Sequence, residues 1–386
     1  MRGASGKPET GGAAGAGPAA GIGLGRATAP EPGAAGAALG KITPSEFERV
    51  IAPRLGASRP EVLTGPRLGT DCAVVRIGAG RVMAVTTDPL SLLPALGAAA
   101  SARLSCHHLA SDLWTSGIQP AYAAVTLNLP PRLGEAELSE YWEAMSAAWE
   151  ELGVAVVGGH TGRYTGCDLT IVGAGTLVGV GDERRTVGPE FVRAGDRVVV
   201  TKGCAIEATA VAAWSFPRTL SERLDTGGMS RARAHLELVS VVVDCRAALG
   251  VGVRDQGVSA LHDATEGGVL GGLVELARSS ACDLRVERGK IPLSPEAEAA
   301  CAMFGVDPYW TLSEGSMIGA VRPNRVAAVL EALGAEGVAA AEVGEVVPGN
   351  GAVWLTEPGG SVSRIEEIPG DPYWAAYDRA VREGWK

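Results

Sequence analysis

The sequence predicts an α+β protein with two domains, and three observations support this prediction. Strand-like and helix-like segments are mixed along the chain, with hairpins among them, which is typical of the α+β class. The length of 386 residues suits about two domains of about 150 residues each. A turn at residues 193–196 leads into a new strand-like run, DRVVVTKG, which opens a second unit.

The composition limits the classes of function. Acidic residues outnumber basic ones, 44 to 34, and no basic block occurs, so neither a nucleic acid nor an anionic membrane surface is an expected partner. The seven cysteines are dispersed without a CxxC pair, which indicates reduced thiols rather than a disulfide framework. No apolar run reaches 18 residues and no signal-peptide pattern opens the sequence, so we expect a cytoplasmic protein without a membrane span.

Residues 1–40 are predicted to be a disordered Gly/Ala-rich tail. They carry few large apolar side chains, so they cannot bury enough surface to offset the entropy cost of ordering. The stretch GIGLG at residues 21–25 has glycines spaced as in a phosphate loop. It follows no strand and opens no helix, so we interpret it as part of the tail.

The first domain, residues 41–188, is expected to begin with a helix that Thr43 caps. A hairpin of two strand-like runs follows, and its second strand is expected to end on Asp88 and Pro89. Residues 135–152 carry apolar side chains at helical spacing. The expected elements are strands at residues 72–77, 81–87, 121–130, 154–159 and 169–181 and helices at residues 101–116 and 135–152.

The second domain, residues 189–350, is expected to open with the strand at residues 196–203, and residues 351–386 form a C-terminal extension. We place the boundary between the domains near residues 185–195, around the turn that precedes this strand. The other expected elements of the second domain are helices at residues 206–214, 232–249, 267–279 and 325–333 and short strands at residues 284–287 and 316–321.

Acidic residues stand where apolar runs of the first domain stop. Asp71 precedes the strand CAVV, Asp88 follows AVTT, and Asp112 interrupts a mostly apolar helix face. A single acid at a strand end is commonly a turn residue or a helix cap. Three of them in one domain favour a shared site, because grouped carboxylates can hold Mg²⁺, which bridges to phosphates.

The run GVAVVGGHTG raises a separate question. A buried-looking strand stops on Gly158 and Gly159 and then presents the imidazole of His160 and the hydroxyl of Thr161. A ligand-facing loop and an ordinary tight turn both fit this pattern.

In the second domain, LHDATEGG places Asp263 and Glu266 before a helix that begins with two glycines. Asp263 or Thr265 can cap that helix, and its bare backbone N–H groups can equally bind a phosphate. His262 alone is more often a packed or capping residue than a catalyst. The sequence shows no arrangement typical of a Ser-His-Asp triad, a zinc site or a cysteine nucleophile, and no GxxxxGK[ST] phosphate loop.

Six segments together resemble the superfamily of aminoimidazole ribonucleotide (AIR) synthase, which also contains thiamine-monophosphate kinase, selenophosphate synthetase and the hydrogenase maturation factor HypE. They are, in order, GTDCAVV, TTDP, LASDLWTSGIQP, GVAVVGGHT, AGDRVVVTKG and HDATEGGVLGGLVELA. The resemblance spans about residues 41–350. The last segment, with KIPLSPEAEAACAMFGVDP after it, is most similar to HypE and its AIR synthase-related relatives.

The resemblance implies a PurM-like fold. In that fold an N-terminal α/β domain forms a β-barrel with a second copy in a homodimer, and a C-terminal α+β domain follows. ATP and Mg²⁺ are expected in the cleft at the dimer interface. By this resemblance, the ligands of the metal and of the ATP phosphates are Asp71, Asp88 and Asp112.

The resemblance also assigns roles to the two glycine-containing segments. Gly158, Gly159 and Thr161 form the loop at the nucleotide phosphates, and His160 faces these phosphates as a catalytic residue. The catalytic acids of the second domain are Asp263 and Glu266.

The sequence departs from the superfamily pattern at several positions. Thr70 stands where the kinases carry an acid in GDD, and His160 replaces the acid in GGDT, which implies weaker or fewer metal sites. HypE acts on its own C-terminal cysteine, whereas this sequence has no cysteine after Cys301, so the same reaction in cis is not expected. The Gly-rich tail also lacks the cysteine or selenocysteine of selenophosphate synthetase.

We therefore expect an ATP-binding, Mg²⁺-dependent enzyme of the HypE-like type. It would activate an oxygen of an unknown small-molecule or protein acceptor by phosphoryl transfer, a reaction that needs mainly positioning and charge neutralisation. Thiamine-monophosphate kinase is the named alternative within this class. An ATP-binding maturation scaffold without turnover is the alternative from another class, motivated by the missing carboxylates and the missing cysteine.

Overall fold

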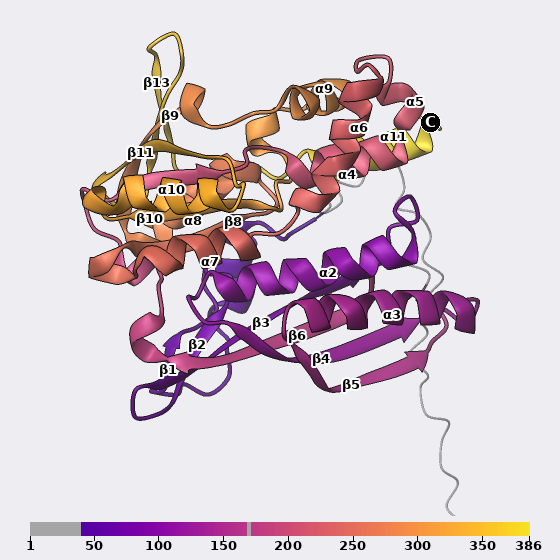
Figure 1. Cartoon of the computed structure of the whole chain (residues 1–386), viewed down its shortest axis with the longest axis horizontal. Coiled ribbons are helices and arrows are strands. Elements are labelled where there is room, and N and C mark those ends of the chain that lie inside the picture. The colour runs from indigo at the N-terminus through magenta and orange to yellow at the C-terminus, as the bar shows by residue number, and fades with distance from the viewer. Residues whose placement is uncertain (1–39, 168–170) are drawn as a thin grey trace, which may run out of the picture. The chain divides into compact units, whose positions relative to one another are not determined.

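The computed structural model describes residues 40–167 and 171–386. Apart from Gly40, the predicted tail lies outside these residues. Within them the chain forms two sheets, each combined with helices, which confirms the α+β class (Figure 1).

The first sheet has the order β1-β2-β3-β6-β4-β5 and is antiparallel except for the parallel pair β4/β5. Its strands are β1 (Val62–Thr64), β2 (Ala73–Gly78), β3 (Arg81–Ser91), β4 (Pro120–Leu129), β5 (Ala155–Arg163) and β6 (Ile171–Asp182). The predicted hairpin is confirmed as the pair β2/β3. Two long helices, α2 (Gly97–Trp114) and α3 (Glu135–Glu151), accompany this sheet.

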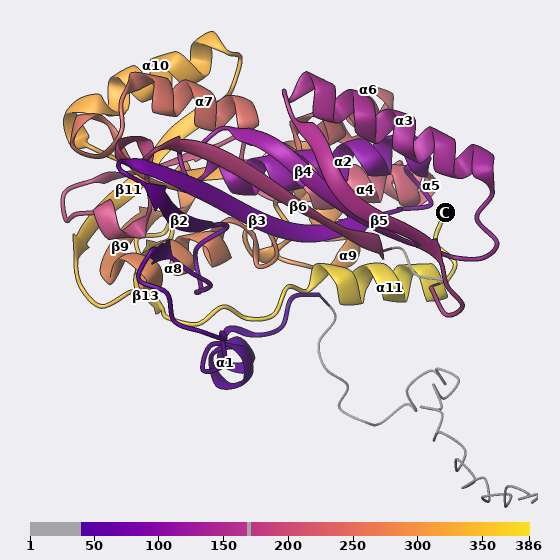
Figure 2. The same ribbon diagram turned by 90° about the horizontal axis from the view of Figure 1, so that it is seen from below.

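Both long helices cover the same face of the first sheet. Leu109 and Leu113 of α2 and Met145 and Trp149 of α3 share a buried core with alternate strand residues such as Leu127. Burial of these apolar side chains is the main stabilising term of this layer. The opposite face has no helix of the described chain over it (Figure 2).

The second sheet has the order β13-β12-β9-β11-β7-β10-β8 and is also mixed, with β9 and β12 parallel. Its strands are β7 (Arg197–Thr201), β8 (Val258–Ala264), β9 (Cys282–Glu287), β10 (Ser316–Val321), β11 (Ala340–Pro348), β12 (Val353–Thr356) and β13 (Val362–Ile365). Its helices are α4 (Ile206–Ser215), α5 (Pro217–Leu220), α6 (Thr226–Ala234), α7 (Val242–Val251), α8 (Gly268–Ser280), α9 (Pro295–Phe304), α10 (Val326–Ala335) and α11 (Tyr373–Arg382).

Helices pack on both faces of the second sheet. Helix α8 shares a core with one face, and α7 and α10 share a core with the other. The remaining helices α4, α5, α6, α9 and α11 form a separate apolar cluster that includes Phe304 and Tyr373 (Figure 1). Strand β8 is therefore buried on both faces although it lies at the edge of the sheet.

Short helical segments complete the described chain. The predicted N-terminal helix is confirmed as α1 (Pro44–Glu46), because the Thr43 side chain accepts a hydrogen bond from the backbone N–H of Glu46. A π-helical turn, η1 (Phe47–Ile51), continues it. The other short segments are η2 (Glu183–Arg185), η3 (Pro189–Phe191), η4 (His235–Leu238), η5 (Arg254–Gln256), η6 (Arg288–Lys290), η7 (Pro308–Trp310) and η8 (Pro323–Arg325).

Two predictions of element ends are wrong. The helix expected at residues 232–249 is divided among α6, η4 and α7, because tertiary contacts satisfy the backbone at the break: Lys202 Nζ donates to the Ser240 carbonyl, and the Val241 N–H donates to Ser111. Strand β3 does not end on Asp88 and Pro89. It continues to Ser91, still paired with β6.

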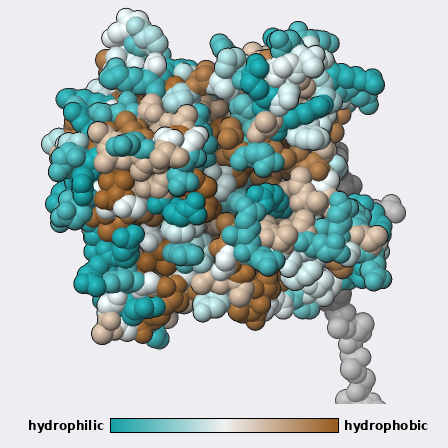
Figure 3. All heavy atoms as spheres, viewed as in Figure 1, coloured by the Kyte–Doolittle hydropathy of each residue, from teal (hydrophilic) through white to brown (hydrophobic). Residues whose placement is uncertain are grey.

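No helix within residues 40–167 and 171–386 is long and apolar enough to cross a membrane. Hydrophilic and hydrophobic residues are interspersed on the face drawn in Figure 3.

Candidate active site

Acidic residues from both sheets converge on one buried site. Asp71 lies in the loop before β2, Asp112 lies in α2, and Asp263 lies in β8. The hydroxyl of Thr86 is 2.9 Å from both the main-chain oxygen of Asp71 and Oδ2 of Asp112, so it ties two of these segments together. Asp88 of β3 is close enough for its charge to act on Asp112. The structure thus brings together the three acids that the sequence singled out as metal ligands, and adds Asp263.

The crowding of these acids perturbs their protonation. Burial raises the pKa of Asp112 well above its usual range, and the charges of Asp263, Asp88 and Asp71 raise it further. Burial also raises the pKa of Asp263. Burial raises the pKa of Asp88 to about 6, against the opposing charge of Lys41. Such groups are costly to ionise unless a cation neutralises them.

Three further acids belong to this site, and the sequence analysis missed them. Burial raises the pKa of Glu207 in α4 to about 8, with the charge of Glu266 adding to the effect. Burial raises the pKa of Glu314 well above its usual range, and the charge of Asp263 adds to it. Burial likewise raises the pKa of Asp371 to about 6. The available signal was an acid inside an otherwise apolar helix, IEATAVAAW, which marks Glu207.

Two cationic side chains face these acids. Lys41 Nζ donates a hydrogen bond of 2.8 Å to Thr265 Oγ1 and lies 3.7 Å from Glu266 Oε2. Desolvation lowers the pKa of Lys41, but the carboxylates of Glu266 and Glu275 outweigh this effect and raise it overall. The sequence predicts that the folded chain begins near Lys41, but it gives no sign that Lys41 is a counterion of these acids.

His262 is the second cation, and it is held between two carboxylates. Its Nε2 is 2.8 Å from Glu275 Oε2, and its Nδ1 is 2.7 Å from Asp71 Oδ1. Burial lowers the pKa of His262, but Asp71 and then Glu275 raise it well above the usual range, which favours the imidazolium form. His262 of the second domain therefore forms an ion pair with Asp71 of the first domain. The sequence suggested only a packed or capping residue at this position.

The glycine turn before α8 is fixed by the C-terminal segment. Gly267 and Gly268 adopt positive φ angles of 89° and 65°, and a side chain at Gly268 would meet the backbone of Tyr309. The N–H of Gly267 donates to Asp371 Oδ2 over 2.8 Å.

These contacts decide part of the question that the sequence left open. No side chain of the helix's own segment caps α8, so the interpretation of Asp263 or Thr265 as its cap is wrong. Asp263 instead lies inside β8, and Thr265 accepts the hydrogen bond from Lys41. The carboxylate of Asp371 already accepts the hydrogen bond of the Gly267 N–H, so this N–H does not face an empty phosphate site.

The GGHT segment is part of a strand and not a turn, so both the loop and the tight-turn interpretations are wrong. Residues 158–161 lie inside β5, where His160 pairs with Thr126 of β4. Gly159 faces the backbone of Val125, and any side chain at Gly159 would collide with it. Gly159 therefore allows two strands to approach closely, which is a different use from a turn.

Strand β5 is also exposed and not buried as its composition suggested. Strand β5 forms the edge of the first sheet. The imidazole of His160 makes a 2.7 Å hydrogen bond between its Nε2 and Tyr164 Oη. Thr161 is likewise exposed. Contact of Gly158, Gly159, His160 or Thr161 with nucleotide phosphates stays a prediction.

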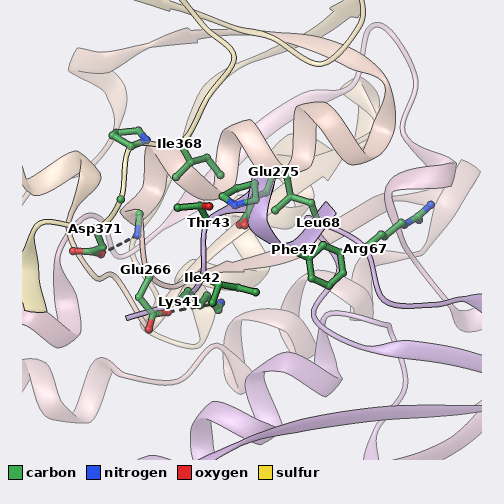
Figure 4. A pocket seen from close by; sticks show the side chains of 15 residues that line it. Lys41, Ile42, Thr43, Phe47, Arg67, Leu68, Glu266, Glu275, Ile368 and Asp371 are labelled. Atoms are coloured by element: carbon green, nitrogen blue, oxygen red, sulfur yellow. Dashed lines mark hydrogen bonds and ion pairs between the residues drawn. The ribbon is translucent and has the colours of Figure 1, made fainter. Parts of the chain in front are cut away.

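A cavity of about 260 Å³ adjoins the acidic site (Figure 4). Lys41, Glu266, Glu275 and Asp371 line it with charge, and Phe47 and Ile368 are among the apolar residues that line it. Figure 4 shows Lys41 turned toward Glu266 on one side of this space. The cavity thus offers apolar contact beside an acidic wall, which suits a small organic ligand with polar groups.

Two sheet-based domains with a shared site of clustered carboxylates define a two-domain α+β protein. Two family models match the chain: the N-terminal domain of AIR synthase related protein over residues 69–180, and the C-terminal domain over residues 193–355. The chain therefore belongs to the AIR synthase-related family, as the sequence motifs indicated.

Sequence relatives of this chain include HypE proteins, and solved HypE structures share its fold. Carbamoyl dehydratase HypE of Rhizobium leguminosarum bv. viciae is 28% identical over 289 residues, which cover 73% of this chain and 78% of the relative. The crystal structure of a HypE–HypF complex matches with a TM-score of 0.65 and 19% identity, covering 84% of this chain and 99% of that one. HypE in complex with ATP matches with a TM-score of 0.62 and 20% identity, covering 86% and 93%. These structures show the PurM-like fold, and the dimeric barrel stays a prediction.

Proposed function

We propose that this protein is an ATP- and Mg²⁺-dependent enzyme of the HypE-like type that activates an oxygen of an acceptor by phosphoryl transfer. The observation that carries this proposal is the set of clustered carboxylates from both domains, with the half-buried Asp112 and the buried Asp263 at its centre. The HypE crystallised with ATP supports the choice of nucleotide. Phosphoryl transfer needs chiefly positioned positive charge, which this site is arranged to recruit.

The residues of the site fit Mg²⁺, which prefers oxygen ligands. Asp71, Asp88 and Asp112 would hold the ion. When bound, Mg²⁺ neutralises charge on the transferred phosphoryl group. Thr86 keeps Asp71 and Asp112 in place through its hydroxyl, and Lys41 places a positive charge beside Glu266.

The acceptor is proposed to bind in the 260 Å³ cavity. Glu266 lines this cavity and Asp263 lies three residues earlier, in β8, so we propose these two acids as the groups that exchange a proton with the acceptor oxygen. Burial raises the pKa of Asp263, which favours its protonated form and suits a proton donor.

A second candidate function is an ATP-binding maturation partner without efficient turnover. One observation favours it: His160 is exposed on an edge strand and hydrogen-bonded to Tyr164, so it is not part of the buried acidic set. The HypE–HypF complex supports a protein as partner.

Nucleotide titration tests both candidates. We expect ATP to bind in isothermal titration calorimetry only with Mg²⁺ present, and Asp112→Asn to weaken this binding by at least about tenfold, because one metal ligand loses its charge. Asp378→Asn on the exposed face of α11 is the matched control and should bind as the wild type does. Binding that is unchanged in Asp112→Asn would remove the proposed site. Binding without any phosphate release in the presence of candidate acceptors would favour the maturation partner.

A homodimer is proposed from the uncovered face of the first sheet. Tyr122 of β4 is 46% exposed, Val157 of β5 is 66% exposed, and Val180 of β6 is 37% exposed. Apolar side chains and an unpaired edge strand on one face are expected to be covered by a second copy.

Charge placed on this face tests the dimer. We expect Val180→Asp to convert a dimer into a monomer in analytical ultracentrifugation, because a carboxylate cannot be buried there without a partner. Val362→Asp, at an exposed position of β13 in the second sheet, should leave the dimer intact. A wild-type chain that sediments as a monomer would contradict the proposal.

A further inference from the structure

The end of β8 holds a group of polar atoms that hydrogen bonding leaves unsatisfied. His262 is 4% exposed and Asp263 is 1% exposed. Neither carboxylate oxygen of Asp263 has a hydrogen-bond partner among the described residues, and neither has Nδ1 of His262. Buried polar atoms without partners are rare in native proteins and call for an explanation such as a bound ion.

These atoms lie in the geometry of a ligand set. One ligand atom each from Asp71, His262 and Asp263 falls within 4.8 Å of the other two. Asp71 Oδ1 is 2.7 Å from His262 Nδ1, yet the pair lacks the geometry of a hydrogen bond. Strand β8 is the edge of its sheet, so the loop that carries Asp71 can reach side chains from both faces of the strand.

The second nitrogen of His262 is oriented by another carboxylate. Glu275 Oε2 lies 2.8 Å from Nε2, on the side of the ring away from Asp71. A histidine that ligates a metal through one nitrogen usually donates the other N–H to a carboxylate, which fixes the tautomer and strengthens the ligand. Glu275 is placed to accept that N–H and to leave Nδ1 free for a metal.

We propose that Asp71, His262 and Asp263 form a binding site for a divalent transition-metal ion of the Zn²⁺ type, with Glu275 as the carboxylate that orients His262. The site shares Asp71 with the set assigned to Mg²⁺, and its imidazole nitrogen distinguishes it from that all-oxygen set, because imidazole suits zinc-like ions and magnesium prefers oxygen. The site does not require nucleotide, so its test is independent of the proposed function.

Thiols do not replace the imidazole as the soft ligand. Among the described residues, the possible ligand atoms that lie within 4.8 Å of one another here come from Asp71, His262 and Asp263. Cys72 follows Asp71 in the chain, but its thiol is not part of this group.

Cobalt chloride is the probe, since Co²⁺ substitutes for Zn²⁺ and absorbs visible light. We expect one Co²⁺ per chain in the absence of nucleotide, bound at least about 100-fold more tightly than Mg²⁺, without the absorption of a cobalt–thiolate bond. His262→Gln should weaken Co²⁺ binding by at least about tenfold, and Glu275→Gln by about tenfold. His235→Gln is the matched control, because both ring nitrogens of His235 already have hydrogen-bond partners, and it should bind Co²⁺ as the wild type does.

Asp263→Asn provides a second test in case the His262→Gln variant does not fold. Asp263 has no hydrogen bond to lose among the described residues, so its neutral analogue should melt at or above the wild-type temperature and still lose Co²⁺ binding. Co²⁺ binding no tighter than Mg²⁺ binding, or wild-type Co²⁺ binding in both Asp263→Asn and His262→Gln, would overturn the proposal.

Discussion

Two short segments, GGHT in β5 and HDATEGG at the end of β8, combine a histidine with two glycines and behave in opposite ways. His160 is exposed and bonded to Tyr164, whereas His262 is buried between Asp71 and Glu275. Both strands are sheet edges, so strand position alone does not explain the difference. The difference arises because helix α8 and the Asp71 loop cover β8, while no described helix covers the outer face of β5. The burial and the ion pairs of each histidine therefore depend on the segments that pack over its strand.

The largest expected effect tests this contrast directly. In metal-free buffer, His262→Ala should lower the free energy of unfolding by about 3 kcal/mol, because it leaves two buried carboxylates facing each other without their cation. His160→Ala should change it by less than about 0.5 kcal/mol. Urea denaturation followed by fluorescence measures both values. Equal, small losses would show that His262 contributes no buried charge pair.

An intermediate effect concerns the pH dependence of the same buried site. Glu207 has a folded pKa of about 8, raised above its unfolded value, so the folded state retains a proton that the unfolded state has lost. Stability therefore falls as pH rises from about 4.5 to about 8. Glu207→Gln lacks this cost, and it should raise the melting temperature at pH 9 by at least about 2 °C and by much less at pH 5.

The control for this pH effect lies on an exposed helix. Glu140→Gln in α3 removes one carboxylate from a solvated position, so it should shift melting equally at both pH values. A shift in Glu207→Gln that does not grow with pH would show that Glu207 is ionised in the folded protein without cost.

The smallest expected effect concerns the glycine turn after β8. Asp371→Ala removes the acceptor of the Gly267 N–H and of the Tyr373 N–H, so it should cost about 1 kcal/mol of stability at pH 7. Hydrogen exchange at these two amides should become faster at the same time. Unchanged exchange at Gly267 would mean that another group, and not Asp371, protects this turn.

Much of the fold could be predicted from local patterns. The hairpin β2/β3, the long helix α3 and the capped start of α1 follow from apolar periodicity and from turn and cap residues, and all three are confirmed. The break between α6 and α7 could not be predicted in this way. It depends on hydrogen bonds to Lys202 and Ser111, which are distant in sequence.

The candidate site could also be predicted only as far as local sequence patterns reveal it. Asp71, Asp88 and Asp112 interrupt apolar runs, so their convergence could be expected from the sequence. Glu314 and Lys41 gain their significance only from neighbours that the fold brings to them. Gly159 of β5 misled the prediction, because a close strand pair and a tight turn both require a residue without a side chain.

The cavity of Figure 4 has walls from both ends of the described chain: Lys41 and Phe47 near its start, and Ile368 and Asp371 near its end. A molecule lodged there would bridge these segments, so its binding energy would oppose fraying of both at once. Ligand binding could then be measured without following a reaction. Protease cleavage at both ends of the folded chain would become slower over the same range of ligand concentration. The two ends of the folded chain would report on a single binding event.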